Sequence, residues 1–311
     1  MSLTNFPEMW QNRVEVNINK ATVATFVDGI AELDTTIVEM GSGTASESNV
    51  IHIPTSDFEP DVLINNTTYP LAVQSYTDSE VLIALDKFQT KATELTDDQI
   101  MGASYARIDA ATASHPRAIT AKKYTKAAHA MSPSTNTVAT PVILTTGDST
   151  EVSGQRLRLT YDDLVNLKEA CDNATPPMPD DSRRLVLCNN HWNDLLHDRK
   201  YFADQFIAYK RGEVVNILGF EIHKFSANPF YNPSTKAKLA FGATPSSGQY
   251  QASFVFCTMN VAKKTGFTKQ YFKLASTDPE NQSNKLNYRH YFIMCPKRVQ
   301  HIAAICSINK A

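Results

Sequence analysis

One stretch, residues 160–225, constrains the fold of this chain more than any other part. It opens with Thr160-Tyr161-Asp162-Asp163, a cap for a helix whose apolar positions recur at helical spacing. Prolines at 176, 177 and 179 stop that helix, and an apolar strand at 183–188, a short Trp/Leu helix and a second strand at 216–225 follow. Alternating helices and strands predict a mixed α/β unit. The stretch contains no catalytic motif, so we expect its function to be assembly through surface contacts.

The composition is that of a folded and nearly neutral protein. Hydrophobic residues make up 42% and charged residues 20% of the 311 residues, which excludes a disordered chain. The formal net charge of −2 argues against a dedicated nucleic-acid-binding protein. The 5 cysteines form no CxxC pair, so neither a zinc ribbon nor a disulfide framework is predicted. No segment reaches the roughly 18 apolar residues that cross a membrane.

Two segments at the start of the chain cannot bury a core by themselves. Residues 1–48 are typical of an arm that packs on another surface, with Gly41-Ser42-Gly43 as a flexible hinge. Residues 49–86 predict an open excursion with strands at 50–53, ended by Pro54, and at 81–85. The connection between these strands is longer than compact domains usually contain. We expect it to lie across a neighbouring subunit.

A long helix is predicted from about Thr96 to Met131. Thr96-Asp97-Asp98-Gln99 matches a capping box, and Pro116 is expected to kink or restart the helix. Tyr124, Ala127, Ala128 and Met131 share one face at helical spacing. The Ser/Thr/Pro-rich residues 132–146 predict a linker between two lobes. Further strands are expected at 253–257, 271–274, 287–295 and 299–308, which makes the fold class α+β.

This order of elements resembles the major capsid proteins of tailed bacteriophages, whose fold is shared by encapsulin shells. The resemblance covers nearly the whole chain, from the arm with Phe6-Pro7-Glu8-Met9-Trp10 to the second strand with Gly219-Phe220-Glu221-Ile222. It implies an N-terminal arm, an extended β-hairpin loop, a peripheral domain with a long spine helix, and a mixed α/β axial domain. The implied boundaries are 1–48 for the arm, 49–86 for the loop and its flanking strands, 87–149 for the peripheral domain, 150–285 for the axial domain, and 286–311 for C-terminal strands that return to the peripheral domain.

The resemblance implies a structural protein without catalytic residues, cofactor or metal. Such a protein assembles through hexamers and pentamers into an icosahedral shell around double-stranded DNA. Its implied partners are other copies of itself, scaffolding, portal and decoration proteins, and packaged DNA through weak non-specific contacts, but no membrane. Its implied location is the virion capsid, with folding in the cytoplasm of the bacterial host. The alternatives are an encapsulin-type nanocompartment shell, a tail or baseplate protein, and a cytosolic hydrolase that uses Cys188 or a histidine.

Several side chains could belong to a chemical site, and each has a simpler structural explanation. Cys188, His191 and His197 could form a nucleophilic pair or a metal site. The simpler interpretation is a buried cysteine at a strand end followed by two histidines on a partly exposed helix. Asp97-Asp98 and Asp162-Asp163 could act as paired carboxylates, but capping and the helix dipole explain both pairs.

The lysines and asparagines allow two further hypotheses. Small basic clusters at Lys122-Lys123, Lys126 and Lys263-Lys264 could touch packaged DNA, although a solvated surface is the simpler interpretation. Some tailed-phage capsids join subunits by an isopeptide bond between a lysine and an asparagine. The required residue types are present at Lys87, Lys91, Asn65 and Asn66, but they are too common to predict such a bond.

Overall fold

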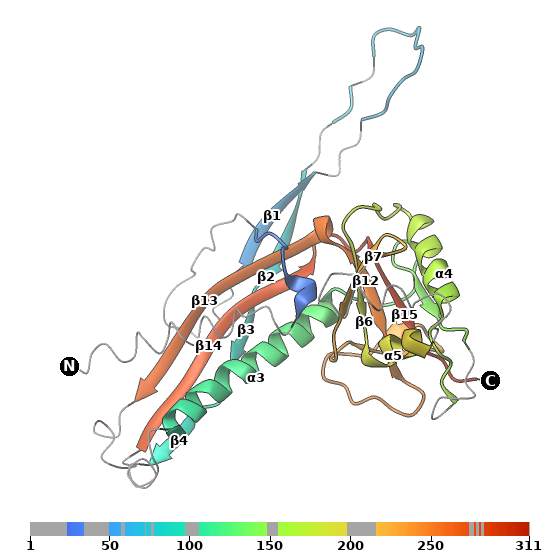
Figure 1. Cartoon of the computed structure of the whole chain (residues 1–311). Helices are drawn as coiled ribbons and strands as arrows, with labels where there is room; N and C mark the ends of the chain where they lie inside the picture. The colour runs from blue at the N-terminus through green and yellow to red at the C-terminus, as the bar shows by residue number, and fades with distance from the viewer. Residues whose placement is uncertain are drawn as a thin grey trace.

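The structure is a computed structural model that describes part of the chain. The described residues are 24–33, 50–56, 60–71, 73–75, 78–96, 106–147, 155–197, 216–273, 277, 280 and 283–310. Figure 1 shows a compact module that carries helices α4 and α5, a long sheet accompanied by helix α3, and a hairpin, β1–β2, that projects away from both. None of the described helices is long and apolar enough to span a membrane.

A six-stranded sheet with the order β5-β15-β12-β6-β8-β7 forms the centre of the compact module. Its strands are β5 (Val142–Leu144), β6 (Arg183–Leu187), β7 (Asn216–Ile217), β8 (Phe220–Lys224), β12 (Ser253–Cys257) and β15 (Ile302–Cys306). The β6–β8 and β15–β5 pairs are parallel, and the other pairs are antiparallel. Every residue of β12 and β15 is buried, and their unbroken apolar runs follow because both faces of these strands are covered.

Alternate residues of β12 contribute to two cores on opposite faces of the sheet. Val255 and Cys257 pack with residues of α4 (Tyr161–Asp172) and α5 (Asn189–His197), among them Leu164 and Trp192. Phe254 and Phe256 pack on the other face with the C-terminal half of α3. The period-two alternation of a strand thus joins the small helices and the long helix to one sheet.

The long sheet is centred on β14 (Ser283–Pro296). It pairs with β13 (Val261–Lys273) on one side, and with β3 (Asp86–Gln89) and β4 (Thr93–Thr96) on the other. Phe292 and Met294 belong to the core that contains α3, whereas Tyr291 belongs to the core at the base of the hairpin. One face of this sheet is therefore covered by α3, and the other by the hairpin base.

Helix α3 (Ala106–Ala130) ties the two sheets together. The predicted apolar face of the helix is confirmed, because Tyr124, Ala127 and Ala128 are buried together with residues of both sheets. Lys238 Nζ donates to the carbonyl oxygens of His129 (2.5 Å) and Ser132 (2.6 Å), which satisfies acceptors at the helix C-terminus. Burial lowers the pKa of this lysine to about 8. The helix end is thereby fixed to the compact module.

The remaining described elements are short or peripheral. The hairpin consists of β1 (Val50–Ser56) and β2 (Asp78–Ala84), which pair from Val50↔Ala84 to Ser56↔Asp78. A small three-stranded sheet has the order β10-β9-β11. Its strands are β9 (Phe230–Asn232), β10 (Ala237–Lys238) and β11 (Tyr250–Gln251), and the 3-10 turns are η3 (Thr25–Val27) and η5 (Thr258–Asn260).

One local prediction is wrong, and strand pairing explains it. Pro54 does not end its strand, because β2 is the one described strand that pairs with β1, and a strand with one unpaired edge tolerates a missing N–H. Thr96 ends β4 and pairs with Ser283 of β14, and the other residues of its predicted capping box lie outside the described residues. Helix α3 continues through Pro116, so the helix does not restart there. The predicted hinge at 41–43 and the capping residue Gln99 lie outside the described residues.

Two predictions of domain organisation also differ from the strand pairing. Residues 132–146 are not a simple linker, since they contain β5, a strand of the six-stranded sheet, and buried Ser132, Thr140 and Thr145. The predicted boundary at 285 falls within β14 and separates most of that strand from β13, although these two strands pair along their length. The last strand, β15, pairs with β12 and β5 and so belongs to the compact module. Strands that pair with segments far away in the sequence show no sign of that pairing in their neighbouring residues.

Candidate assembly surfaces

The β1–β2 hairpin is anchored at its base and projects from the body at its tip (Figure 1). Ile51 and Ile83 lie opposite each other in the register and are 2% and 7% exposed. They pack with Leu85, Ala262 and Tyr291 in a core of their own. Burial of about five apolar side chains fixes the direction in which the hairpin leaves the sheet.

The segment beyond the hairpin strands exposes a run of large apolar side chains. Val62, Ile64 and Val73 are 82%, 83% and 95% exposed, and Leu63, Tyr69 and Leu71 are more than half exposed. Polar contacts order the backbone locally: the Asp61 N–H donates to Gln74 Oε1 (3.0 Å), and the Thr68 N–H donates to Asn66 Oδ1 (3.1 Å). Large apolar side chains exposed together in one segment indicate an interaction site.

Residues 24–33, within the predicted arm, pack on the body of the same chain. Phe26 is fully buried, and its ring lies 5.2 Å from Phe225, 6.0 Å from Phe254 and 6.4 Å from Phe256. Arg184 Nη1 donates to the carbonyl oxygen of Phe26 (2.9 Å). These residues thus pack on another surface, which is the body of their own chain, and the rest of the predicted arm lies outside the described residues.

The same N-terminal segment also reaches the long sheet. Lys263 Nζ donates to the Ile30 carbonyl oxygen (3.1 Å), and Lys264 Nζ donates to that of Leu33 (2.8 Å). The Leu33 N–H donates in turn to the Lys263 carbonyl oxygen (2.9 Å). Since Phe26 is held by the compact module, the segment forms a strap across both sheets.

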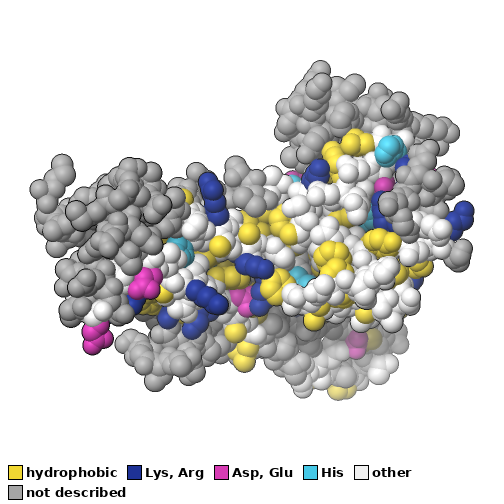
Figure 2. All heavy atoms as spheres, turned by 90° about the horizontal axis from the view of Figure 1, so that it is seen from below, with side chains coloured by type: hydrophobic (Ala, Val, Ile, Leu, Met, Phe, Trp, Pro, Cys, Tyr) yellow, Lys and Arg dark blue, Asp and Glu magenta, His cyan; other side chains and the backbone are white. Residues whose placement is uncertain are grey.

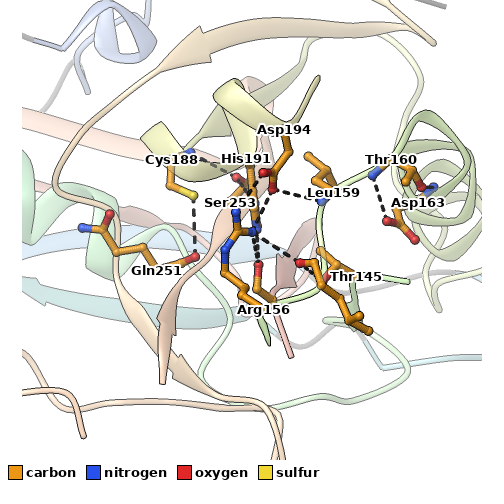
Figure 3. A network of polar contacts seen from close by, with 12 residues as sticks. Thr145, Arg156, Leu159, Thr160, Asp163, Cys188, His191, Asp194, Gln251 and Ser253 are labelled. Carbon is orange, nitrogen blue, oxygen red and sulfur yellow. Dashed lines mark hydrogen bonds and ion pairs between the residues drawn. The ribbon is translucent and has the colours of Figure 1, made fainter. Parts of the chain in front are cut away.

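A buried polar network lies at the centre of the compact module (Figure 3). Arg156 donates from Nη1 to Asp194 Oδ2 (2.7 Å) and from Nη2 to Asp194 Oδ1 (2.8 Å), in the bidentate geometry that carboxylates favour. Asp194 Oδ2 also accepts the Leu159 N–H (3.0 Å), and Ser307 Oγ accepts from Arg156 Nη1 (2.9 Å). This network joins α5 to the segment before α4 and to the end of the chain.

His191 extends this network and is held neutral. It lies between Ser253 Oγ, 2.7 Å from Nδ1, and Ser307 Oγ, 2.9 Å from Nε2. Burial lowers the pKa of His191 to about 4, because the nearby Arg156 and the loss of solvent outweigh the attraction of Asp194. Ser253 Oγ accepts the Cys188 N–H (3.1 Å), so its hydroxyl hydrogen can be donated to Nδ1 of a neutral ring.

Cys188 and its neighbouring histidines do not form a nucleophilic pair. The Cys188 thiol is buried and donates to the Gln251 carbonyl oxygen (3.6 Å), while both ring nitrogens of His191 bond serines. Burial raises the pKa of the Cys188 thiol, which disfavours the thiolate that attacks a substrate. The prediction of a partly exposed helix is correct for His197 and wrong for His191, which is fully buried.

The acidic pairs behave as helix caps where the structure describes them. Asp163 accepts the Thr160 N–H (3.0 Å) and donates its own N–H to Thr160 Oγ1 (3.3 Å), which completes a capping box at the start of α4. Asp97 and Asp98 lie outside the described residues. Within the described part of the chain, no group of three or more His, Cys, Asp and Glu side chains could hold a metal ion.

Most of the clustered lysines contact groups of their own chain. Lys123 is 2% exposed and its Nζ lies 4.3 Å from the Phe292 ring centroid, so the solvated-surface interpretation is wrong for it. Lys126 pairs with Asp86 (2.8 Å), and Lys263 and Lys264 hold the strap described above. Lys122 alone among these lysines is exposed without an ion pair to any described residue.

The sequence matches no protein-family model and no curated protein. Several solved structures are similar to this chain over most of the length of both chains. The capsid of cyanophage P-SCSP1u has a TM-score of 0.56 at 16% identity, with 89% of this chain and 93% of that chain covered. The capsid of Ralstonia phage GP4 has a TM-score of 0.58 at 6% identity, with 85% and 84% covered. The virus-like particle from Pyrococcus furiosus has a TM-score of 0.52 at 9% identity, with 97% and 99% covered.

These similarities establish the fold of the chain. Identities of this order carry no information about individual residues, but each alignment covers at least 84% of both chains. The chain has the α+β fold of tailed-phage capsid proteins, as the resemblance predicted. Because one fold can serve several functions, the function needs its own argument from the surfaces.

Proposed function

We propose that this chain is the major capsid protein of a tailed bacteriophage. In this role it assembles through hexamers and pentamers into an icosahedral shell around double-stranded DNA. The observation that carries the proposal is the projecting segment at 60–75, whose apolar side chains have no cover in the isolated chain. A fold shared with phage capsids supports a second copy of the chain as that cover.

The roles of the parts follow from the proposal. The hairpin within 49–86 is the extended loop that lies over a neighbouring subunit. The long sheet with α3 is the peripheral domain, and the six-stranded sheet with α4 and α5 is the axial domain. Interlocked hairpins bury large obligate interfaces, on the order of several thousand Å² in such assemblies. The chain therefore acts as a structural protein, with scaffolding, portal and decoration proteins as its further partners in the virion.

The deciding experiment is electron microscopy of the purified protein together with size-exclusion chromatography. The proposal expects closed polyhedral particles, or rings of five or six subunits. A protein that stays monomeric or dimeric at high concentration would contradict it. Tubes or stacked rings without closed particles would favour the tail or baseplate alternative.

A second candidate, an encapsulin-type nanocompartment shell, is favoured by one specific observation. The virus-like particle from Pyrococcus furiosus aligns with 97% of this chain, with a TM-score of 0.52. Both candidates predict closed particles, so their contents distinguish them. In cells that also express the genes next to the gene of this chain, the particles are expected to contain packaged DNA under the phage proposal. Under the alternative they are expected to contain a cargo enzyme. The hydrolase alternative is disfavoured, because Cys188 is buried and its thiol pKa is raised.

A further inference from the structure

A basic groove lies between strand β3 and helix α3. Its volume is about 570 Å³, and it is lined by residues 87–91 on one side and by α3 residues up to Lys122 on the other. Phe88, His115 and Ile119 are buried or half-buried, and Lys87, Lys91 and Lys122 are exposed. Figure 2, which views the molecule from below, shows Lys and Arg side chains gathered on the half that carries α3.

The positive charge of this groove is not neutralised within the described part of the chain. None of the described residues that line the groove is a carboxylate. The adjacent Asp86 pairs with Lys126 at 2.8 Å, and no described carboxylate pairs with the three exposed lysines. His115 contributes no charge at neutral pH, since it contacts Thr93 Oγ1 (3.0 Å) and burial lowers its pKa. The field of the groove therefore comes from Lys87, Lys91 and Lys122.

The position of the groove favours a polyanion over a neighbouring hairpin as its occupant. The hairpin projects upward in Figure 1, and Figure 2 shows that the face seen from below also carries Lys and Arg side chains. The other clustered lysines bond groups of their own chain, which leaves these three for an external partner. Lysine ammonium groups are compact point charges that bind phosphates without reading sequence.

We propose that this groove binds the phosphate backbone of the DNA enclosed by the shell. This inference rests on the proposed function, and it assigns the DNA contact to Lys87, Lys91 and Lys122. Each subunit binds weakly and without sequence preference, because only about three phosphates are neutralised. Many copies on one inner surface compensate for the weakness of each contact.

The test compares two triple variants in DNA binding by unassembled subunits. The groove variant carries Lys87→Gln, Lys91→Gln and Lys122→Gln. The control variant carries Lys224→Gln, Lys269→Gln and Lys273→Gln, which removes the same charge from other exposed positions. Binding of a labelled duplex of about 20 base pairs is followed by fluorescence anisotropy between roughly 50 and 200 mM salt. Circular dichroism and thermal unfolding verify that both variants fold.

The groove variant is expected to lose at least about tenfold in affinity at low salt. The slope of log K against log salt concentration is expected to become less negative by about 2.7, which is about 0.9 for each of three lost phosphate contacts. The control variant is expected to keep most of the wild-type slope. An unchanged slope in the groove variant, an equal loss in the control, or no salt-dependent binding by the wild type would each overturn the proposal.

Assembly is examined separately by electron microscopy, so that failure of this inference and failure of the proposed function are distinguishable. Both variants are expected to form the same particles as the wild type. If the groove variant binds DNA normally but forms no particles, the groove is a contact between copies and the inference is wrong. If the wild type forms neither closed particles nor rings of five or six subunits, the proposed function fails, whatever the DNA-binding result.

Discussion

Arg156 and Asp194, 38 residues apart in the sequence, form a bidentate ion pair whose two partners are only 7% and 5% exposed. The pair is surrounded by further partners, because Asp194 also accepts the Leu159 N–H and Arg156 also donates to Ser307 Oγ. A buried charge is tolerated only where such partners replace water. The pair thus fixes how α5 sits against the segment before α4.

Asp194→Ala is expected to destabilise the subunit by about 3–5 kcal/mol, because it leaves the Arg156 guanidinium buried without its partner. Asp86→Ala serves as the matched control: it breaks the Lys126–Asp86 pair, whose side chains are 42% and 31% exposed, and should cost less than about 1 kcal/mol. Urea unfolding of unassembled subunits gives both values. Equal losses in the two variants would mean that the buried network does not organise the module.

Phe26→Ala is expected to cost about 3–5 kcal/mol, since the side chain is fully buried among three other aromatic rings. Phe272→Ala, at a side chain that is 40% exposed, should cost far less. The same urea experiment measures both. If Phe26→Ala leaves the unfolding free energy unchanged, the strap at 24–33 is not part of the folded subunit in solution.

His191 is expected to make the subunit acid-sensitive. Its pKa is about 4 in the folded chain, against 6.5 for an ordinary histidine, so the unfolded chain binds more protons between these values. Stability therefore falls as the pH drops from about 6.5 to about 4, by roughly 3 kcal/mol from this residue. His191→Gln should flatten this part of the curve relative to the wild type. The exposed His197→Gln should leave the wild-type slope, and an identical slope in all three proteins would contradict the assignment.

The elements that could be predicted from the sequence are those whose signals are local. The capping box at Thr160, the buried run of β12 and the apolar face at Tyr124 carry their pattern within a few residues, and all three are confirmed. Strand pairing between distant segments has no such signal. Thr96 opens a local capping pattern and also ends β4, where it pairs with β14, and β15 joins a sheet whose other strands lie far away in the chain.

The surfaces were harder to predict than the fold. The long connection at 54–80 indicated an assembly element by its length alone. The basic groove was missed, because Lys87 and Lys91 meet Lys122 only when α3 packs beside β3. The pattern of Lys122-Lys123 did not reveal that one of these lysines is exposed and the other is buried against Phe292. A helix turns by about 100° per residue, so neighbours in the sequence face different surroundings.

Removal of the projecting segment is expected to abolish assembly while leaving the subunit folded. The register places Ser56 opposite Asp78, so residues 57–77 can be replaced by Asn-Gly, which closes a two-residue hairpin turn. The buried base at Ile51 and Ile83 stays intact, and the described part of the deleted segment is exposed. The unfolding free energy should therefore change by less than about 1 kcal/mol, since loop-closure entropy depends only weakly on loop length.

A second variant separates the apolar side chains from the length of the loop. This variant keeps the full length of the loop and carries Val62→Ser, Ile64→Ser and Val73→Ser. It removes apolar side chains that are 82%, 83% and 95% exposed. If these side chains are covered by a neighbouring copy, both variants elute as small species in size-exclusion chromatography and form no closed particles in electron micrographs. Normal particles from the deletion variant would show that the segment is dispensable for assembly. Normal particles from the serine variant alone would mean that the backbone, and not the apolar surface, makes the contact.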